Sequence, residues 1–220
     1  MTAALRDIVN GPWSSQLRQY HQASASSIDQ VVTYTATDPP ARVTNPDMSN
    51  FLEARISRSQ VAAPAPHTPR IYTILVPTGT LAADHSLTGF HSYYLRDNSI
   101  PVYLAWILND GTLTGANSIP KLFSHELAET LTDADGNTGE HLLTGTHERD
   151  EIADVCNYLY KTINGHAEQA YWSNAAHTCV LPTASAPLSA RPILGEVWRC
   201  LLRQTAPVGS RTNRGNQHDR

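Results

Sequence analysis

The chain has 220 residues, 40% of them hydrophobic, so it is long enough to bury a core as one domain. A net charge of -4 and a pI of about 6.2 provide no basic surface for nucleic acid, so we predict no nucleic-acid partner. No apolar run approaches the roughly 20 residues that span a bilayer. Residues 1–7 lack the features of a signal peptide, so either the protein is cytoplasmic or its leader lies outside this sequence.

Hydrophobic periodicity and turn residues predict a mixed set of helices and strands in the first half of the chain. The predicted elements are a broken helix over 8–22, a strand over 28–35, a helix from Asp47 to about Arg58, and strands over 70–76 and 102–108. We expect Asp47 to cap its helix and strand 70–76 to be a central strand. The alternation of elements favours an α/β fold.

Residues 124–133, with the sequence SHELAETLTD, are the most informative segment of the chain. They follow Pro120, which is favoured in the first turn of a helix, and their apolar spacing predicts a helix. On a helix, His125 and Glu129 lie one turn apart on the same face. An imidazole and a carboxylate so placed can bind one metal ion, and Glu126 beside them can accept a proton from water. The segment therefore predicts a zinc hydrolase site in which glutamate replaces the second histidine of HExxH.

The same pattern on an exposed helix would be only a solvated acidic face. Its context favours a metal site, because the helix is rich in apolar residues and follows the hydrophobic strand 102–108. A second acidic cluster, residues 150–154, lies where a second helix over 150–160 could bring further ligands. We therefore expect a sheet packed on a metal-binding helix.

A catalytic zinc site needs a third protein ligand, and four residues are candidates. Glu151 is the first choice and Asp154 lies on the same predicted helical face, where it could ligate or hold the free N–H of His125. Asp135 follows His125 at a spacing used by other zinc peptidases. His91 could act as a ligand or as a catalytic donor to the transition state. The sequence does not choose among the four.

After the metal helix, residues 133–149 form a long polar segment that we predict to be a loop. Residues 171–174 and 179–182 predict a last packed segment. We therefore place the metal-binding domain at 1–182. Residues 183–220 are rich in Ala, Ser and Pro, and we predict that they are partly helical and then disordered.

Five segments of the chain, together with their order along it, resemble the plant phosphate-induced (EXORDIUM-like) proteins and their bacterial relatives. The matching segments are the SHELAE motif at 124–129, Gly-Phe-His-Ser at 89–92, Glu-Ile-Ala-Asp-Val-Cys at 151–156, Trp-Ser-Asn at 172–174 and Cys-Val at 179–180. The resemblance covers about residues 70–182. It implies a disulfide between Cys156 and Cys179, which would leave Cys200 unpaired.

The same segments are similar to thermolysin-type peptidases, in which a glutamate on a following helix completes the zinc site. This similarity implies a zincin-like fold and favours Glu151 as the third ligand. The chain departs from those peptidases at Glu129, where they have a histidine. An added carboxylate ligand makes the metal less positive and so weakens its effect on the acidity of bound water.

We therefore expect a single zincin-like α/β domain with long loops that hydrolyses a peptide or other amide, with Glu126 and His91 as catalytic residues. The predicted metal ligands are His125, Glu129, Glu151 and Asp154, and the predicted ion is zinc, with calcium as an alternative. The rival hypothesis is a secreted, non-enzymatic protein with a structural metal. Composition, with only two lysines, favours secretion. Substrate and oligomeric state are not determined by the sequence.

Overall fold

The computed structural model describes residues 1–20, 27–35, 40–65, 70–97, 99–134 and 151–181. All of them belong to one compact unit, Met1–Leu188. A second unit, Ser189–Arg220, lies outside the described residues, and so do Cys200, Asp135 and the predicted C-terminal segment 183–220. In the described part of the chain no helix is long and apolar enough to cross a membrane.

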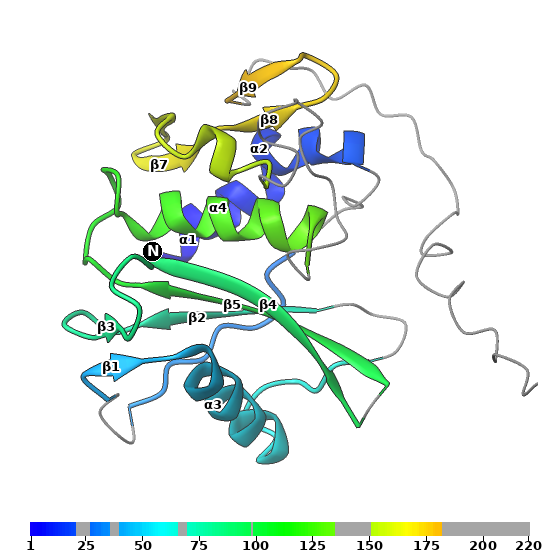
Figure 1. The fold of residues 1–220 in the computed structure, drawn as a ribbon, viewed down its shortest axis with the longest axis vertical. Helices are drawn as coiled ribbons and strands as arrows, with labels where there is room; N and C mark the ends of the chain where they lie inside the picture. Colours follow the sequence, from blue (N-terminus) through cyan, green and yellow to red (C-terminus); the bar gives the residue numbers. More distant parts are fainter. Residues whose placement is uncertain (21–26, 36–39, 66–69, 98, 135–150, 182–220) are drawn as a thin grey trace, which may run out of the picture. The chain divides into compact units, whose positions relative to one another are not determined.

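A three-stranded mixed sheet forms the middle of the molecule (Figure 1). Its strands are β2 (Ile71–Val76), β4 (Gly89–Arg96) and β5 (Ile100–Leu108), in the order β2-β5-β4. Strand β2 runs parallel to β5, and β4 runs antiparallel to it. The prediction that segment 70–76 is central is wrong. The central strand is β5, whose residues from Leu104 to Ile107 are buried, whereas β2 is mostly half-buried.

Helix α3 (Asn45–Ser57) covers one face of this sheet. Its buried residues Met48, Leu52 and Ile56 are spaced one turn apart and pack against Val102, Leu104 and Trp106 of β5, among others. The helix prediction is confirmed, although Thr44, not Asp47, is the N-cap. Asp47 is the third helical residue, and its carboxylate accepts a hydrogen bond from the Thr44 backbone N–H at 2.8 Å, completing a capping box.

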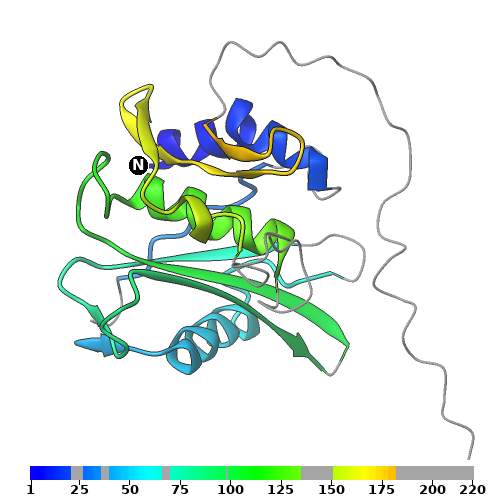
Figure 2. The same cartoon turned by 45° about the horizontal axis from the view of Figure 1, so that its top comes forward.

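Helix α4 (Ile119–Thr132) covers the opposite face and confirms the predicted helix that bears the HExxE segment. Its other side is covered by α1 (Thr2–Asn10), α2 (Pro12–Ser15) and η1 (Gln16–Tyr20), so α4 lies between the sheet and the N-terminal helices (Figure 2). These N-terminal helices confirm the broken helix predicted near Gly11.

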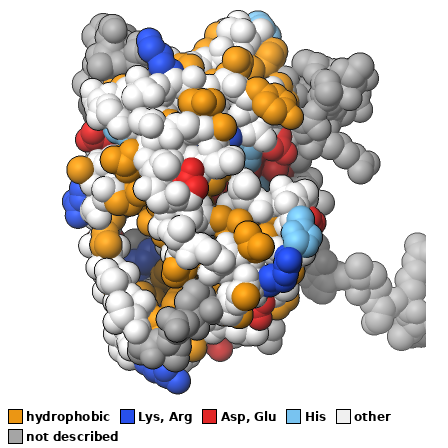
Figure 3. Space-filling model, turned by 90° about the vertical axis from the view of Figure 1, so that its left-hand side faces the viewer, with side chains coloured by type: hydrophobic (Ala, Val, Ile, Leu, Met, Phe, Trp, Pro, Cys, Tyr) orange, Lys and Arg blue, Asp and Glu red, His pale blue; other side chains and the backbone are white. Residues whose placement is uncertain are grey.

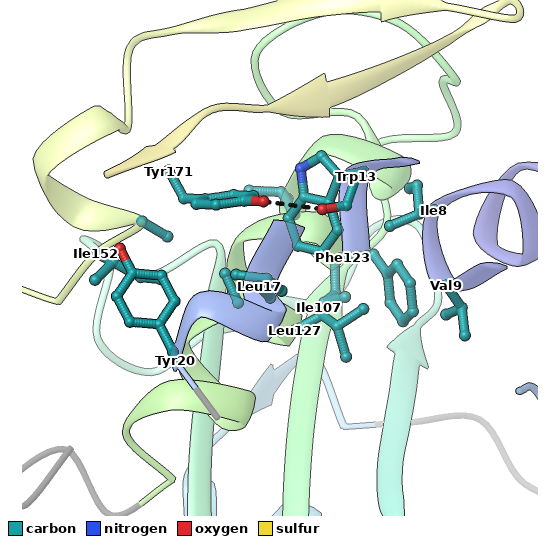
Figure 4. Packing of buried hydrophobic residues seen from close by; sticks show 13 residues of the cluster. Ile8, Val9, Trp13, Leu17, Tyr20, Ile107, Phe123, Leu127, Ile152 and Tyr171 are labelled. Carbon is teal, nitrogen blue, oxygen red and sulfur yellow. Dashed lines mark hydrogen bonds between the residues drawn. The ribbon is translucent and has the colours of Figure 1, made fainter. Parts of the chain in front are cut away.

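The apolar core above the sheet joins α4 to both ends of the described chain. Trp13 and Tyr171 meet edge to face, and the Tyr171 hydroxyl donates a 3.0 Å hydrogen bond to the Trp13 carbonyl (Figure 4). Phe123 and Leu127 of α4 lie in the same cluster. Because α4 is covered on both sides, its position is fixed by packing on the sheet and on the N-terminal helices.

Short two-stranded ladders complete the fold. They are β1 (Arg42–Val43) with β3 (Leu81–Ala82), β6 (Tyr160–Ile163) with β7 (His166–Gln169), and β8 (Tyr171–Ser173) with β9 (Thr178–Val180). The last ladder confirms the predicted packed segment near the end of the domain. The disulfide between Cys156 and Cys179 is also confirmed, and it ties η2 (Asp154–Cys156) to β9.

Two predicted elements are wrong. Residues 28–35 form no strand in the structure, and Val31 and Val32 are exposed. Ile28 packs against the core around α4 and Tyr34 packs on Phe51, but a strand also needs a neighbouring strand, and the described residues supply none. The second helix predicted over 150–160 is also absent, because the described part of that segment is a turn followed by the short η2, and β6 begins at Tyr160.

Candidate metal centre

The candidate centre lies between α4 and the edge strand β4. His91 is the third residue of β4, pairs in register with Ala105 of β5, and is buried. The helical spacing places Nε2 of His125 3.1 Å from Oε1 of Glu129, as the sequence predicts. The fold therefore brings His91 from the sheet to the face of α4 that carries the HExxE segment.

Glu129 is the hub of the cluster, and its side chain is only 3% exposed. Its two oxygens face two different imidazoles, since Oε2 lies 3.2 Å from Nδ1 of His91 and Oε1 lies 3.1 Å from Nε2 of His125. Oε1 nevertheless has no hydrogen-bond partner of acceptable geometry. A buried carboxylate oxygen without a partner is costly, so its environment calls for a cation or a proton.

The spacing of His125 and Glu129 fits two ligands of one metal ion. Zinc binds imidazole nitrogen and carboxylate oxygen at about 2.0–2.2 Å, so two ligand atoms of a tetrahedral site lie about 3.3 Å apart. The His125–Glu129 pair, at 3.1 Å, is close to that spacing. Two groups of potential ligand atoms, each within 4.8 Å of one another, share Glu129: His91, Glu129 and Glu151 form one, and His125, Glu126 and Glu129 form the other.

Glu151 and Asp154 reach the cluster from the turn that precedes and begins η2. Oε1 of Glu151 lies 3.1 Å from Nε2 of His91, and Oδ1 of Asp154 lies 3.5 Å from Nε2 of His125. The turn is held in place by the disulfide at Cys156 and by the Trp172 N–H, which donates to the Ile152 carbonyl at 2.8 Å. Of the four candidates for the third ligand, three are therefore near the HExxE helix, while Asp135 lies outside the described residues.

His91 lies between three carboxylates and one carbonyl. Nδ1 is 3.5 Å from Oε2 of Glu126, in addition to its contact with Glu129, and Nε2 is 3.0 Å from the carbonyl oxygen of Asp133. Burial by itself lowers the pKa of His91, but the hydrogen bonds to Glu126, Glu129 and Glu151 outweigh it and raise that pKa to about 12. Without a metal ion, His91 is therefore the positive charge that the carboxylates surround.

The pKa values of His125, Glu129 and Glu126 are shifted by burial and by one another's charges. Burial lowers the pKa of His125, but the charge of Glu129 and its close contact with the ring raise the pKa of His125 to about 9. Burial alone would raise the pKa of Glu129, yet the positive charge of His125 and the close contacts with both histidines hold that pKa at about 2. Burial raises the pKa of Glu126. On the face shown in Figure 3, by contrast, acidic side chains are few and scattered among polar and apolar ones.

Gln169, at the end of β7, is a site residue that the sequence analysis missed. It is fully buried, and its Nε2 lies 2.8 Å from Nδ1 of His125 while donating to the Ala153 carbonyl at 2.9 Å. Its backbone is fixed as well, because its N–H donates to Oγ of Ser124 and its carbonyl accepts from Nε1 of Trp13. A lone glutamine far from the motif gives no signal in a sequence.

The Gln169 carboxamide faces Nδ1 of His125, so its orientation is linked to the tautomer of that ring. An N–H directed at Nδ1 leaves the proton of a neutral ring on Nε2, the atom that faces Glu129. Ligation through Nε2 needs the other tautomer, in which Nδ1–H donates to Oε1 of Gln169. Oε1 of Gln169 is buried and accepts no hydrogen bond in the structure. Rotation of the carboxamide would let this oxygen accept a hydrogen bond from Nδ1–H of His125.

Lys121, one turn before His125 on α4, is a second missed residue. Its side chain is buried, and Nζ donates a 2.7 Å hydrogen bond to Oδ1 of Asn157, just beyond η2. Burial lowers the pKa of Lys121, and the nearby charges of Glu126, Glu129 and Asp154 oppose that effect. Lys121 thus fastens the turn that bears Glu151 and Asp154 to the helix that bears His125.

Comparison of the chain with protein-family models, with curated proteins and with solved structures finds no match. The resemblance to the EXORDIUM-like proteins therefore stays a prediction, and the site stands on its own geometry. That geometry is a buried group of histidine and glutamate side chains that could hold a metal ion.

Proposed function

We propose that this chain is a zinc-dependent hydrolase, most simply a metallopeptidase with a zincin-like fold. The observation that carries the proposal is the Glu129 carboxylate, which is buried between His91 and His125, and whose Oε1 accepts no hydrogen bond of acceptable geometry. A sequence under no functional constraint would replace such a group with an apolar one, because an incompletely paired buried charge destabilises the fold.

His125 and Glu129 would hold the ion. Glu151, which belongs with Glu129 to the group of His91, would have to move toward His125 to complete the set. Glu151 is preferred because its Oε1 is buried 3.1 Å from Nε2 of His91, just as Oε1 of Glu129 is buried 3.1 Å from Nε2 of His125. Asp154 is the alternative, and its side chain is 53% exposed. A mixed set of imidazole and carboxylate ligands favours zinc, whereas calcium prefers oxygen ligands alone.

When bound, the ion would supply Lewis acidity toward a substrate carbonyl and toward a water molecule. Glu126 would accept the proton of the attacking water and pass it to the leaving amine. Its raised pKa suits this role, because a general base works best when its pKa approaches the working pH. His91, which lies beside both Glu126 and Glu129, would hold these carboxylates in place and donate a hydrogen bond to the developing oxyanion.

A second function, a structural metal site in a non-enzymatic protein, is favoured by one observation. Glu126 is only 4% exposed and has an oxygen within 4.8 Å of the ligand atoms of His125 and Glu129, so it could be a further ligand in a closed site. In either case the disulfide favours an oxidising compartment, so we propose that the protein is secreted.

Replacement of Glu126 by glutamine separates the two functions. If Glu126 is the base, Glu126→Gln keeps one zinc per chain by elemental analysis but loses hydrolysis of a peptide library by about 10²–10⁴-fold. If Glu126 is a ligand, the variant loses zinc affinity. Glu53→Gln on α3, a half-exposed glutamate far from the cluster in sequence, is the matched control and should leave both properties unchanged. A wild-type protein that binds zinc and cleaves nothing at any pH would contradict the hydrolase.

A further inference from the structure

The start of β4 lies against the side chain of Glu126. A Cβ atom placed on Gly89 would lie 2.3 Å from Oε1 of Glu126, 3.1 Å from its Cδ and 3.2 Å from its Cγ. Contacts under 3 Å between such atoms do not occur in folded proteins, and the other two are tighter than ordinary packing. The strand can therefore approach the carboxylate this closely only because residue 89 has no side chain.

The backbone of Gly89 does not itself require glycine. Four glycines of the described chain have a positive φ, namely Gly79, Gly111, Gly115 and Gly165, and Gly89 is not among them. Gly89 is the first residue of β4 and pairs in antiparallel register with Ile107 of β5. An alanine could adopt this extended conformation, and it would ordinarily restrict the unfolded chain and stabilise the strand. The requirement at position 89 is therefore one of space.

The Glu126 carboxylate is buried and is in contact with His91 on its other side. It is only 4% exposed, and its second oxygen, Oε2, lies 3.5 Å from Nδ1 of His91. Its backbone is fixed within α4, where the Thr130 hydroxyl also donates to the Glu126 carbonyl at 2.7 Å. Any side chain at position 89 would push the carboxylate along the helix or toward His91 and Glu129.

We infer that Gly89 is a positioning residue for Glu126, and that the absence of its side chain determines where the carboxylate lies relative to His91 and Glu129. The expected effect of Gly89 on catalysis rests on the proposed function, in which Glu126 is the base. The structural consequence, a clash whose three nearest atoms all belong to Glu126, is independent of any activity.

A double-mutant cycle in thermal stability tests the structural consequence. Gly89→Ala should lower the Tm by roughly 5 °C, because overpacking a full site is destabilising. In the Glu126→Ala background the same substitution should leave the Tm unchanged or raise it, since the clashing carboxylate is gone. Equal losses in both backgrounds would overturn the inference. If Gly89→Ala fails to fold, a double variant that folds supports the inference, and a double variant that also fails to fold overturns it.

A second cycle tests the positioning of the proposed base. Gly89→Ala should keep its zinc, determined by elemental analysis, and lose about 10²-fold in kcat with little change in KM, because a catalytic group displaced by about 1 Å loses that much. In the Glu126→Gln background, Gly89→Ala should cause no further loss. A wild-type protein without hydrolysis would contradict the proposed function and leave the stability cycle to decide on Gly89. Normal kcat in Gly89→Ala would contradict the inference and leave the hydrolase intact.

Discussion

Helices α3 and α4 lie on opposite faces of the same sheet and use their residues differently. Of the thirteen residues of α3, three are buried, all apolar and one turn apart. Of the fourteen residues of α4, twelve are buried, and half of these twelve are polar or charged. The first helix is a one-sided amphipathic helix, whereas the second is enclosed by the sheet on one side and by the N-terminal helices on the other.

The buried polar residues of α4 fall into two groups, apart from Lys121, which donates to Asn157. Ser124, Thr130 and Thr132 donate to carbonyls of their own helix. Glu126 and Glu129 have the histidines of the candidate centre as charged partners. The hydroxyls of a buried helix can therefore be accommodated locally, whereas its carboxylates need a charged partner.

The largest expected difference between the two helices comes from removing one glutamate from each. Glu129→Ala should abolish zinc binding, and at about 100 times Kd of zinc the lost stabilisation is about 2.7 kcal/mol. That corresponds to a fall in Tm of roughly 5–10 °C. Glu53→Ala on α3 removes only a hydrogen bond from Tyr94 and a half-exposed ion pair with Arg96, so it should cost about 1 kcal/mol or less. Elemental analysis and thermal unfolding with and without zinc check both. Full zinc occupancy in Glu129→Ala would remove the distinction between the helices.

A smaller effect is expected from removing Gln169, the side chain that supports His125. Gln169→Ala should weaken zinc affinity by about 10–100-fold, because the ring of a ligating histidine is oriented by the partner of its other nitrogen. The matched control is Gln19→Ala. Gln19 accepts hydrogen bonds from the Ser173 hydroxyl and the Ala175 N–H, so it joins η1 to β8 without touching the centre. Competition of each variant with a zinc chelator measures the affinities. Equal affinities in the two variants would show that Gln169 has no role at the site.

The smallest effect belongs to α3 and tests whether its stability is purely local. Thr44→Ala should cost about 0.5–2 kcal/mol through loss of the capping box. Hydrogen bonds from Thr44 lower the pKa of Asp47 below 3.8, so the stability that Asp47 adds is present above that pH and is lost as pH falls through the lower, folded pKa. The cost of Thr44→Ala in chemical denaturation should therefore be constant near pH 6 and shrink in acid, with zinc affinity unchanged throughout. A cost that persists undiminished in acid would show that the carboxylate of Asp47 takes no part in the cap.

The sequence by itself determined the features that depend on neighbouring residues. The helix at 119–132 and the one-turn pairing of His125 with Glu129 follow from helical periodicity and a well-placed proline. Helix α3 follows from the spacing of Met48, Leu52 and Ile56. The apolar run around 102–108 predicts β5, because a strand buried on both faces needs continuous hydrophobic residues.

Only the tertiary structure decided the features that depend on distant residues. Segment 28–35 has strand composition but no strand partner among the described residues. The turn that leads into η2 is held by the disulfide and by a hydrogen bond from Trp172 of β8. The same long-range packing brings to the helix His91, which lies 34 residues before His125, and Gln169, which lies 44 residues after His125. It also makes Gly89 a neighbour of Glu126. These contacts lie between segments far apart in the chain, where local propensity carries no information, so burial and close packing alone select them.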